Sequence, residues 1–181
     1  CIGGIVPANS VQAASLKIRY SGKTRYYKGK QLHVSYANKN LSSKYVGIQI
    51  NKVNMIPYYD YLVKQGPKVK RTYSKSSGKL ILKNGDDTLT AYVGKRTYYL
   101  NGVKKTFSVA PTKVKYYKTK KTIILIPANA IVKGLGLNYK YSSSSKRIYI
   151  TQPVIPSDST TQVQTQPSGS VQYTNYNKSL S

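Results

Sequence analysis

The sequence predicts an α+β fold of two tandem units, each a curved antiparallel β-sheet wrapped around one short α-helix. Two observations support this prediction. Short alternating strands, bounded by Gly-containing turns, fill residues 15–151, and one pattern of residues occurs twice along them. Each copy also contains a helix of about two to three turns, which is too short to be stable unless strands cover its apolar side.

The repeat is clearest where the two helices begin. Met55-Ile-Pro-Tyr-Tyr-Asp-Tyr-Leu-Val-Lys-Gln-Gly66 matches Leu125-Ile-Pro-Ala-Asn-Ala-Ile-Val-Lys-Gly-Leu-Gly136, with Pro57 and Pro127 70 positions apart. Proline is favoured at a first helical position, and a glycine can cap the last turn. Two weaker echoes occur in the same order, between residues 22–27 and 94–99 and between residues 80–82 and 148–150. Three matches in one order indicate a duplicated unit.

The two helices differ in the strength of their apolar stripe. In the second unit the stripe follows the spacing i, i+3, i+4, i+7 and consists of Ala128, Ile131, Val132 and Leu135. In the first unit it is weaker and consists of Tyr58, Tyr61, Leu62 and Gln65. We expect Gly66 and Gly136 to adopt the left-handed conformation that ends each helix.

Composition divides the chain into five segments. Residues 1–14 are uncharged and end in small residues, which is typical of the remnant of a secretory signal peptide. A lipidated Cys1 is the alternative for this segment. The repeats occupy residues 15–83 and 84–151, a Pro/Ser/Thr/Gln-rich linker follows over 152–172, and residues 173–181 resemble the start of a truncated downstream region.

The residue inventory argues against an enzyme. The chain has 30 Lys and Arg residues but 4 acidic ones, giving a net charge of +26, and it has one His and one Cys. Paired carboxylates, metal clusters and Cys–His dyads need residue types that are scarce here, so we expect no catalytic residue, metal or cofactor. His33 lacks supporting ligands, and Asp86-Asp87 follow Asn84-Gly85 as turn residues. No apolar run reaches the ~20 residues of a membrane span.

Basic and aromatic residues alternate along several segments, which predicts a polyanion-binding surface. Lys and Arg neutralise anionic groups, and Tyr rings stack on sugars or bases. The alternative is a solvated basic face over a Tyr-rich core. Lys118-Thr-Lys-Lys121 is the densest patch, in a predicted loop. The candidate contact residues are Lys68, Lys70, Arg71, Lys113, Lys115, Tyr116, Tyr117, Lys118, Lys120 and Lys121.

The second unit resembles the copper amine oxidase N-terminal-like domain, also called the stalk domain. The landmarks of the resemblance are Tyr98-Tyr-Leu-Asn-Gly-Val-Lys104, Val109-Ala-Pro111, Leu125-Ile-Pro127, Gly134-Leu-Gly136 and Lys146-Arg-Ile-Tyr-Ile150. Ala128-Asn129 replace the Leu-Arg of the family pattern, and Tyr139 or Tyr141 replaces its Trp. The resemblance implies a curved antiparallel sheet around a helix. It also implies a non-catalytic module of a secreted bacterial surface protein, with copper confined to a separate catalytic domain.

Together these features predict a secreted, extracellular or cell-wall-associated stalk. We expect it to associate with anionic cell-wall polymer or peptidoglycan and to present its own downstream domain. One alternative is the N-terminal part of a glucosaminidase- or amidase-like cell-wall hydrolase whose catalytic domain is missing. The other is a basic nucleic-acid-binding protein, against which the secretory features argue.

Overall fold

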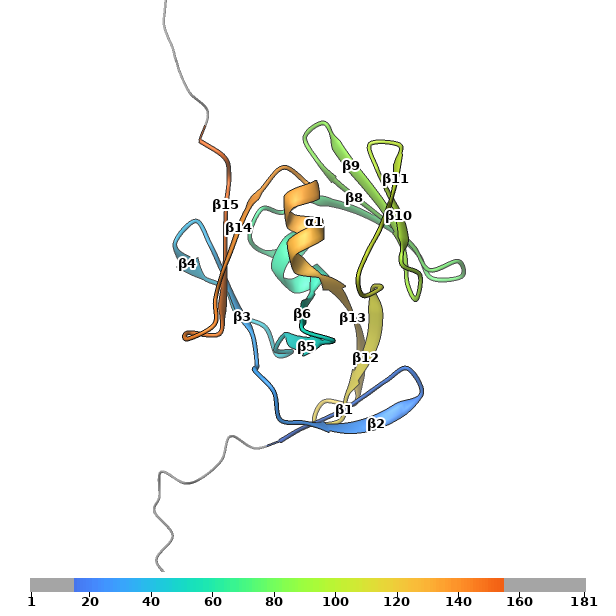
Figure 1. Ribbon diagram of the computed structural model, residues 1–181, viewed down its shortest axis with the longest axis vertical. Coiled ribbons are helices and arrows are strands. Elements are labelled where there is room, and N and C mark those ends of the chain that lie inside the picture. The colour runs from blue at the N-terminus through green and yellow to red at the C-terminus, as the bar shows by residue number, and fades with distance from the viewer. Residues whose placement is uncertain (1–14, 155–181) are drawn as a thin grey trace, which may run out of the picture.

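The computed structural model describes residues 15–154, which fold into three β-sheets and two short helices (Figure 1). A central sheet of six strands has the order β2-β1-β12-β13-β6-β5. In chain order its members are β1 (Leu16–Tyr20), β2 (Lys23–Tyr27), β5 (Ile48–Ile50), β6 (Val53–Pro57), β12 (Thr112–Tyr116) and β13 (Lys121–Pro127).

Two further sheets complete the fold. A five-stranded sheet has the order β11-β10-β9-β8-β7, and a four-stranded sheet has the order β14-β15-β3-β4. The five-stranded sheet contains β7 (Lys70–Ser74), β8 (Lys79–Asn84), β9 (Asp87–Tyr92), β10 (Thr97–Leu100) and β11 (Val103–Thr106). The four-stranded sheet contains β3 (His33–Tyr36), β4 (Lys39–Asn40), β14 (Asn138–Ser142) and β15 (Arg147–Thr151).

Strands β6 and β13 pair in antiparallel register at the centre of the molecule. Ile56 lies opposite Ile126, Met55 opposite Pro127, and Pro57 opposite Leu125. Residues that are 70 positions apart in the sequence therefore exchange places about an approximate local two-fold axis. Each strand leads directly into a helix, β6 into η3 (Tyr59–Lys64) and β13 into α1 (Ala128–Gly134).

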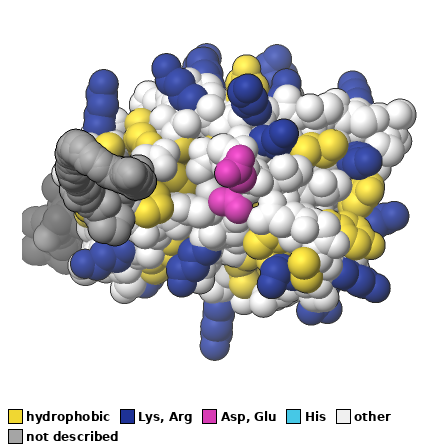
Figure 2. Space-filling model, turned by 90° about the horizontal axis from the view of Figure 1, so that it is seen from above, with side chains coloured by type: hydrophobic (Ala, Val, Ile, Leu, Met, Phe, Trp, Pro, Cys, Tyr) yellow, Lys and Arg dark blue, Asp and Glu magenta, His cyan; other side chains and the backbone are white. Residues whose placement is uncertain are grey.

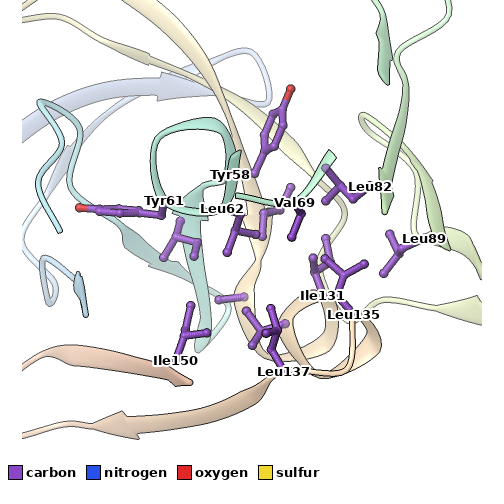
Figure 3. Close-up of a cluster of buried hydrophobic side chains, with 14 of the residues drawn as sticks. Tyr58, Tyr61, Leu62, Val69, Leu82, Leu89, Ile131, Leu135, Leu137 and Ile150 are labelled. Atoms are coloured by element: carbon purple, nitrogen blue, oxygen red, sulfur yellow. The ribbon is translucent and has the colours of Figure 1, made fainter. Parts of the chain in front are cut away.

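The hydrophobic core lies on both faces of this pair of strands. On one face Ile56 and Ile126 join a large cluster that includes Tyr61 and Leu62 of η3 and Ile131 of α1 (Figure 3). On the other face Met55 and Leu125 join a smaller cluster, whose remaining buried members are Ile18, Ile48, Ile50, Val109, Val114 and Tyr116. Because successive side chains of a strand alternate between faces, one short strand pair contributes to both clusters.

The α+β class is correct in its coarse form, because curved sheets enclose two short helices. Two separate units are not confirmed. The predicted boundary at residues 83 and 84 falls at the end of β8, which pairs with β9 of the other half. Strand β1 likewise pairs with β12, and β3 pairs in parallel with β15. Since η3 and α1 share one apolar cluster, the two halves bury their helices jointly.

The second predicted helix is confirmed, whereas the first has a different geometry. Within α1 and its C-terminal cap the stripe of Ala128, Ile131, Val132 and Leu135 is fully buried, and Gly136 has the expected positive φ of 77°. The first segment forms η3, a π-helical turn. The Gln65 side-chain amide donates to the main-chain carbonyl oxygen of Asp60 at 2.9 Å and so satisfies one carbonyl group of this turn.

Several expectations concern residues outside the described range. They are the signal remnant at residues 1–14, most of the linker at 152–172, and the downstream region at 173–181. Within residues 15–154, neither helix has the length and apolarity needed to cross a bilayer.

We predict that Gly66→Ala destabilises the protein more than Gly102→Ala. Both glycines have positive φ, 62° and 82°, so either substitution should cost about 1–2 kcal/mol of backbone strain. A Cβ at Gly66 would also clash with the Tyr61 carbonyl oxygen, whereas nothing lies within 4 Å of one at Gly102. We therefore expect roughly 1–3 kcal/mol of additional loss for Gly66→Ala. Urea denaturation measures the free energy of unfolding of both variants. An equal loss of stability in the two would contradict the close packing at the end of η3.

Candidate polyanion-binding surface

The outward side of the central sheet carries alternating cations and tyrosines. On β1, Ile18 is buried while Lys17 and Arg19 are exposed. The register places Arg19 opposite both Thr24 of β2 and Lys115 of β12. We call this surface the basic–aromatic face, and its residues are Lys17, Arg19, Thr24, Tyr26, Lys115 and Tyr117.

Tyr117 lies at the centre of the basic–aromatic face. The Nζ atoms of Lys17 and Lys115 lie 4.5 and 4.9 Å from its ring centroid. Its hydroxyl shares a 3.1 Å hydrogen bond with the Thr24 hydroxyl, which in turn accepts a 3.1 Å bond from Arg19 Nη1. Like charges that face each other across strands are destabilising, and the electron-rich face of the ring offsets part of that repulsion.

The same contacts lower the pKa of Tyr117. The hydrogen bond with Thr24 has the largest effect, and the positive charges of Lys115, Arg19 and Lys17 add to it. Both effects favour the phenolate over the neutral phenol. The lowered pKa therefore reflects first the hydrogen bond with Thr24 and second the cations that surround the ring.

A groove of about 370 Å³ opens beside the basic–aromatic face. We call it the tyrosine groove. One wall comes from the start of η3 and from β7 with the residue that follows it, and the other wall comes from β12 and β13. Its lining residues are Tyr58, Tyr59, Arg71, Tyr73, Lys75, Lys113, Thr122, Ile123 and Ile124.

Two tyrosines with different environments hold Arg71 in the groove. Arg71 Nη1 donates to the hydroxyl of Tyr58 at 3.1 Å, and its guanidinium carbon lies 4.9 Å from the ring centroid of Tyr59. Tyr58 is 3 % exposed, whereas Tyr59 is 44 % exposed. Figure 3 shows the Tyr58 hydroxyl pointing away from the aliphatic side chains of the core. Burial raises the pKa of Tyr58, so its hydroxyl stays neutral.

The register of the central sheet explains why these residues meet. Pro57 lies opposite Leu125, so the chain leaves β6 at the level of Ile124, and Ile124 itself lies opposite Lys113. Tyr58 and Tyr59 follow Pro57 directly and therefore reach the outward side of β12 and β13. Lys113 and Lys115 are alternate residues of β12, which places the groove and the basic–aromatic face on one side of the sheet.

The structure brings together four of the predicted contact residues. Arg71 and Lys113 line the tyrosine groove, and Lys115 and Tyr117 belong to the basic–aromatic face. The turn 117–120 follows β12, as expected for a loop, and Lys118, Lys120 and Lys121 are exposed there or at the start of β13. Lys68 and Lys70 are also exposed, but strand alternation directs Lys70 to the side of β7 opposite Arg71.

Tyr116 is a correction to the predicted set. It is 3 % exposed, packs in the smaller core cluster, and donates a 2.6 Å hydrogen bond to the carbonyl oxygen of Val46. Burial raises its pKa. Because neighbouring strand residues face opposite sides, Tyr116 points into the core while Lys115 points outward, so Tyr116 is not available to a ligand.

The candidate contact residues did not include those that complete both parts of the surface. Lys17 and Arg19 lie in one of the segments where basic and aromatic residues alternate, and their alternation around buried Ile18 places them on the outward side. Tyr58 and Tyr59 carried no such signal, because their place in the groove depends on the pairing of Pro57 with Leu125 across 68 positions.

The model of one protein family, the copper amine oxidase N-terminal domain, matches residues 37–150. The chain belongs to this family. The resemblance noted from the sequence is thus confirmed. The comparisons with curated proteins and with solved structures gave no match.

The segment that matches the family contains one part of the candidate surface and leaves out another. It runs from the turn before β4 into β15 and crosses the boundary expected between two units. The tyrosine groove lies inside the matched segment, whereas the hairpin of β1 and β2 lies outside it. The basic–aromatic face therefore combines family strand β12 with a hairpin that precedes the match.

The family name raises the question of copper, and the described residues do not fit it. His33 is the single histidine of the chain and is exposed on β3. Partial burial, with the charges of Arg147 and Lys146, lowers its pKa. Within residues 15–154, no three His, Cys, Asp or Glu side chains gather where they could hold a metal. Copper sites are built from several imidazole or thiolate ligands, so we derive no chemistry through copper. The N-terminal domain of copper amine oxidase is itself a non-catalytic domain.

We predict that the neighbouring residues Tyr116 and Tyr117 ionise on opposite sides of the ordinary tyrosine pKa, Tyr116 above it and Tyr117 below it. The absorbance of phenolate measures ionisation, and Tyr117→Phe should remove a tyrosine that titrates below the ordinary value of about 10. Tyr116→Phe should leave the curve of the folded protein unchanged below that pH. Because burial raises the pKa of Tyr116, its neutral form contributes fully to the stability of the fold below about pH 10. That stability is lost as pH rises further, since the unfolded chain ionises first. Loss of the early-titrating component in Tyr116→Phe would contradict this assignment.

Proposed function

We propose that this chain is a non-catalytic extracellular module that binds anionic cell-wall polymer or peptidoglycan and presents a downstream domain. The observation that carries the proposal is the row of Lys113, Lys115 and Tyr117 on one side of the central sheet. Lys17 and Arg19 extend this row across β1, and Arg71 extends it to β7. A polymer with regularly spaced negative charges could contact several of these cations at once.

The charge balance of the surface supports binding to a polyanion. The acidic residues of the described part are Asp60, Asp86 and Asp87, and none belongs to the basic–aromatic face or the tyrosine groove. Asp60 accepts a hydrogen bond from Ser43, and Asp87 accepts one from Asn101. Figure 2 shows one face of the molecule, where Lys and Arg side chains surround a small acidic patch. A net charge of +26 repels itself, and an anionic polymer would relieve that repulsion.

The environment of the cations also supports binding over a purely structural role. Lys17 and Lys115 lie near a tyrosine ring, where the Nζ atom keeps its donors for an incoming anion. A lysine tied to a carboxylate would first have to break that pair. The extracellular setting rests on the uncharged segment 1–14 and on the resemblance to stalk modules of surface proteins. A wall-hydrolase domain downstream would suit such a module, since attachment keeps the enzyme near its substrate.

We predict that binding depends on the basic–aromatic face more than on total charge. The full chain is titrated with purified anionic wall polymer at several salt concentrations, and affinity should fall as salt rises. Lys17→Glu combined with Lys115→Glu should weaken binding about tenfold or more, which corresponds to at least about 1.4 kcal/mol. Lys104→Glu with Lys105→Glu on exposed β11 makes the same charge change elsewhere.

The affinities of the two double variants for wall polymer are then compared. An equal loss of affinity in both would show that binding depends on net charge alone, and absence of binding at low salt would overturn the proposal. Tighter binding of duplex DNA than of wall polymer under the same conditions would favour the nucleic-acid alternative.

A further inference from the structure

We propose that the tyrosine groove recognises one sugar unit bearing an acidic group. The ring of Tyr59 would stack on the sugar, and Arg71 would bind its phosphate or carboxylate. This inference rests on the proposed function and names the unit of the polymer that the groove selects. The basic–aromatic face would then contribute charge, and the groove would contribute selectivity.

Arg71 is held in position before any ligand arrives. The Tyr58 hydroxyl accepts one of its N–H groups at 3.1 Å, and the Tyr59 ring lies beside the guanidinium at 4.9 Å. Within residues 15–154, Tyr58 is the one group to which the Arg71 side chain donates, so its other donors remain for a ligand. The planar fork of arginine matches the two oxygens of a phosphate or carboxylate, and a fixed fork loses less entropy on binding.

Tyr59 provides the stacking surface. Its ring is 44 % exposed and stands edge-on to the buried Tyr58 ring, with an interplanar angle of 83° and centroids 6.4 Å apart. The buried tyrosine thus packs edge-on beside the exposed one and supports it from the side of the core. The apolar C–H face of a sugar ring can pack on such a ring, and the half-buried Ile123 and Ile124 extend the apolar surface.

The remaining lining residues suit an acidic sugar. Lys75, in the turn after β7, and Lys113 of β12 are exposed on opposite walls of the groove, so they add positive charge around the ligand. The Thr122 hydroxyl can donate to or accept from a sugar hydroxyl. A volume of about 370 Å³ lies at the small end of ligand pockets, about 300–1,000 Å³, and fits a single sugar unit of a longer chain.

The test compares ligands that separate charge from sugar. The full chain is titrated by calorimetry with a sugar-phosphate oligomer, an oligoglucuronate, a neutral oligosaccharide of equal length and inorganic polyphosphate. We expect both acidic oligosaccharides to bind at least about tenfold more tightly than the neutral one, and the preference between them to tell phosphate from carboxylate. Tyr59→Leu and Arg71→Lys should each weaken the acidic oligosaccharides about tenfold and polyphosphate less than about twofold.

Two further variants test whether the effect is specific to Tyr59 and whether it depends on the position of Arg71. Tyr99→Leu removes another exposed tyrosine, 38 % exposed on β10 and outside both parts of the surface, and should leave the preference for acidic sugars unchanged. Tyr58→Phe removes the hydroxyl that positions Arg71 while keeping the ring. It should weaken the acidic oligosaccharides and leave polyphosphate binding intact. Thermal unfolding of each variant checks that the fold is retained.

The outcomes separate this inference from the proposed function. Equal weakening of polyphosphate and sugar ligands by Arg71→Lys, or tighter binding of an oligonucleotide than of acidic sugars, would overturn the sugar site. Binding of polyphosphate without any preference for acidic sugars would also overturn it and leave the proposed function standing. Failure of every anion to bind at low salt would overturn both.

Discussion

The antiparallel pairing of β6 with β13 is the interaction on which the rest of this structure depends. Ile56 and Ile126 meet on one face of the pair, and Met55 and Leu125 contribute to the other. Both faces are buried, so the pair anchors two apolar clusters and also sets where η3 and α1 begin. A shift of one residue in this register would exchange the two faces and place each side chain in the wrong cluster.

The same pairing creates the candidate site. Because Pro57 ends β6 opposite Leu125, Tyr58 and Tyr59 emerge beside the outward side of β12 and β13, where Arg71 reaches them from β7. The protein concentrates like charges on this side and places tyrosine rings among them. Ring faces attract cations without neutralising them, so the self-repulsion of this surface is reduced while its positive charge is kept.

Prediction from sequence succeeded where local rules dominate. The apolar stripe of α1 and the left-handed Gly136 follow from residue spacing and backbone sterics, and both are confirmed. It failed for Tyr116, because two adjacent tyrosines in a basic segment look alike until the strand faces are assigned. It also missed the π-helical geometry of η3, which a weak stripe of tyrosines does not distinguish from an ordinary helical turn.

The sequence alone therefore determined the family, the α+β class, the strongly basic character and the position of both helices, since all of these depend on composition or short-range spacing. Only the tertiary structure decided how the two halves combine and which basic residues share a surface. Those features depend on pairings such as Ile56 with Ile126 and β1 with β12, whose partners lie far apart in the chain. Their free energy comes from burying apolar area between distant segments, which local patterns do not encode.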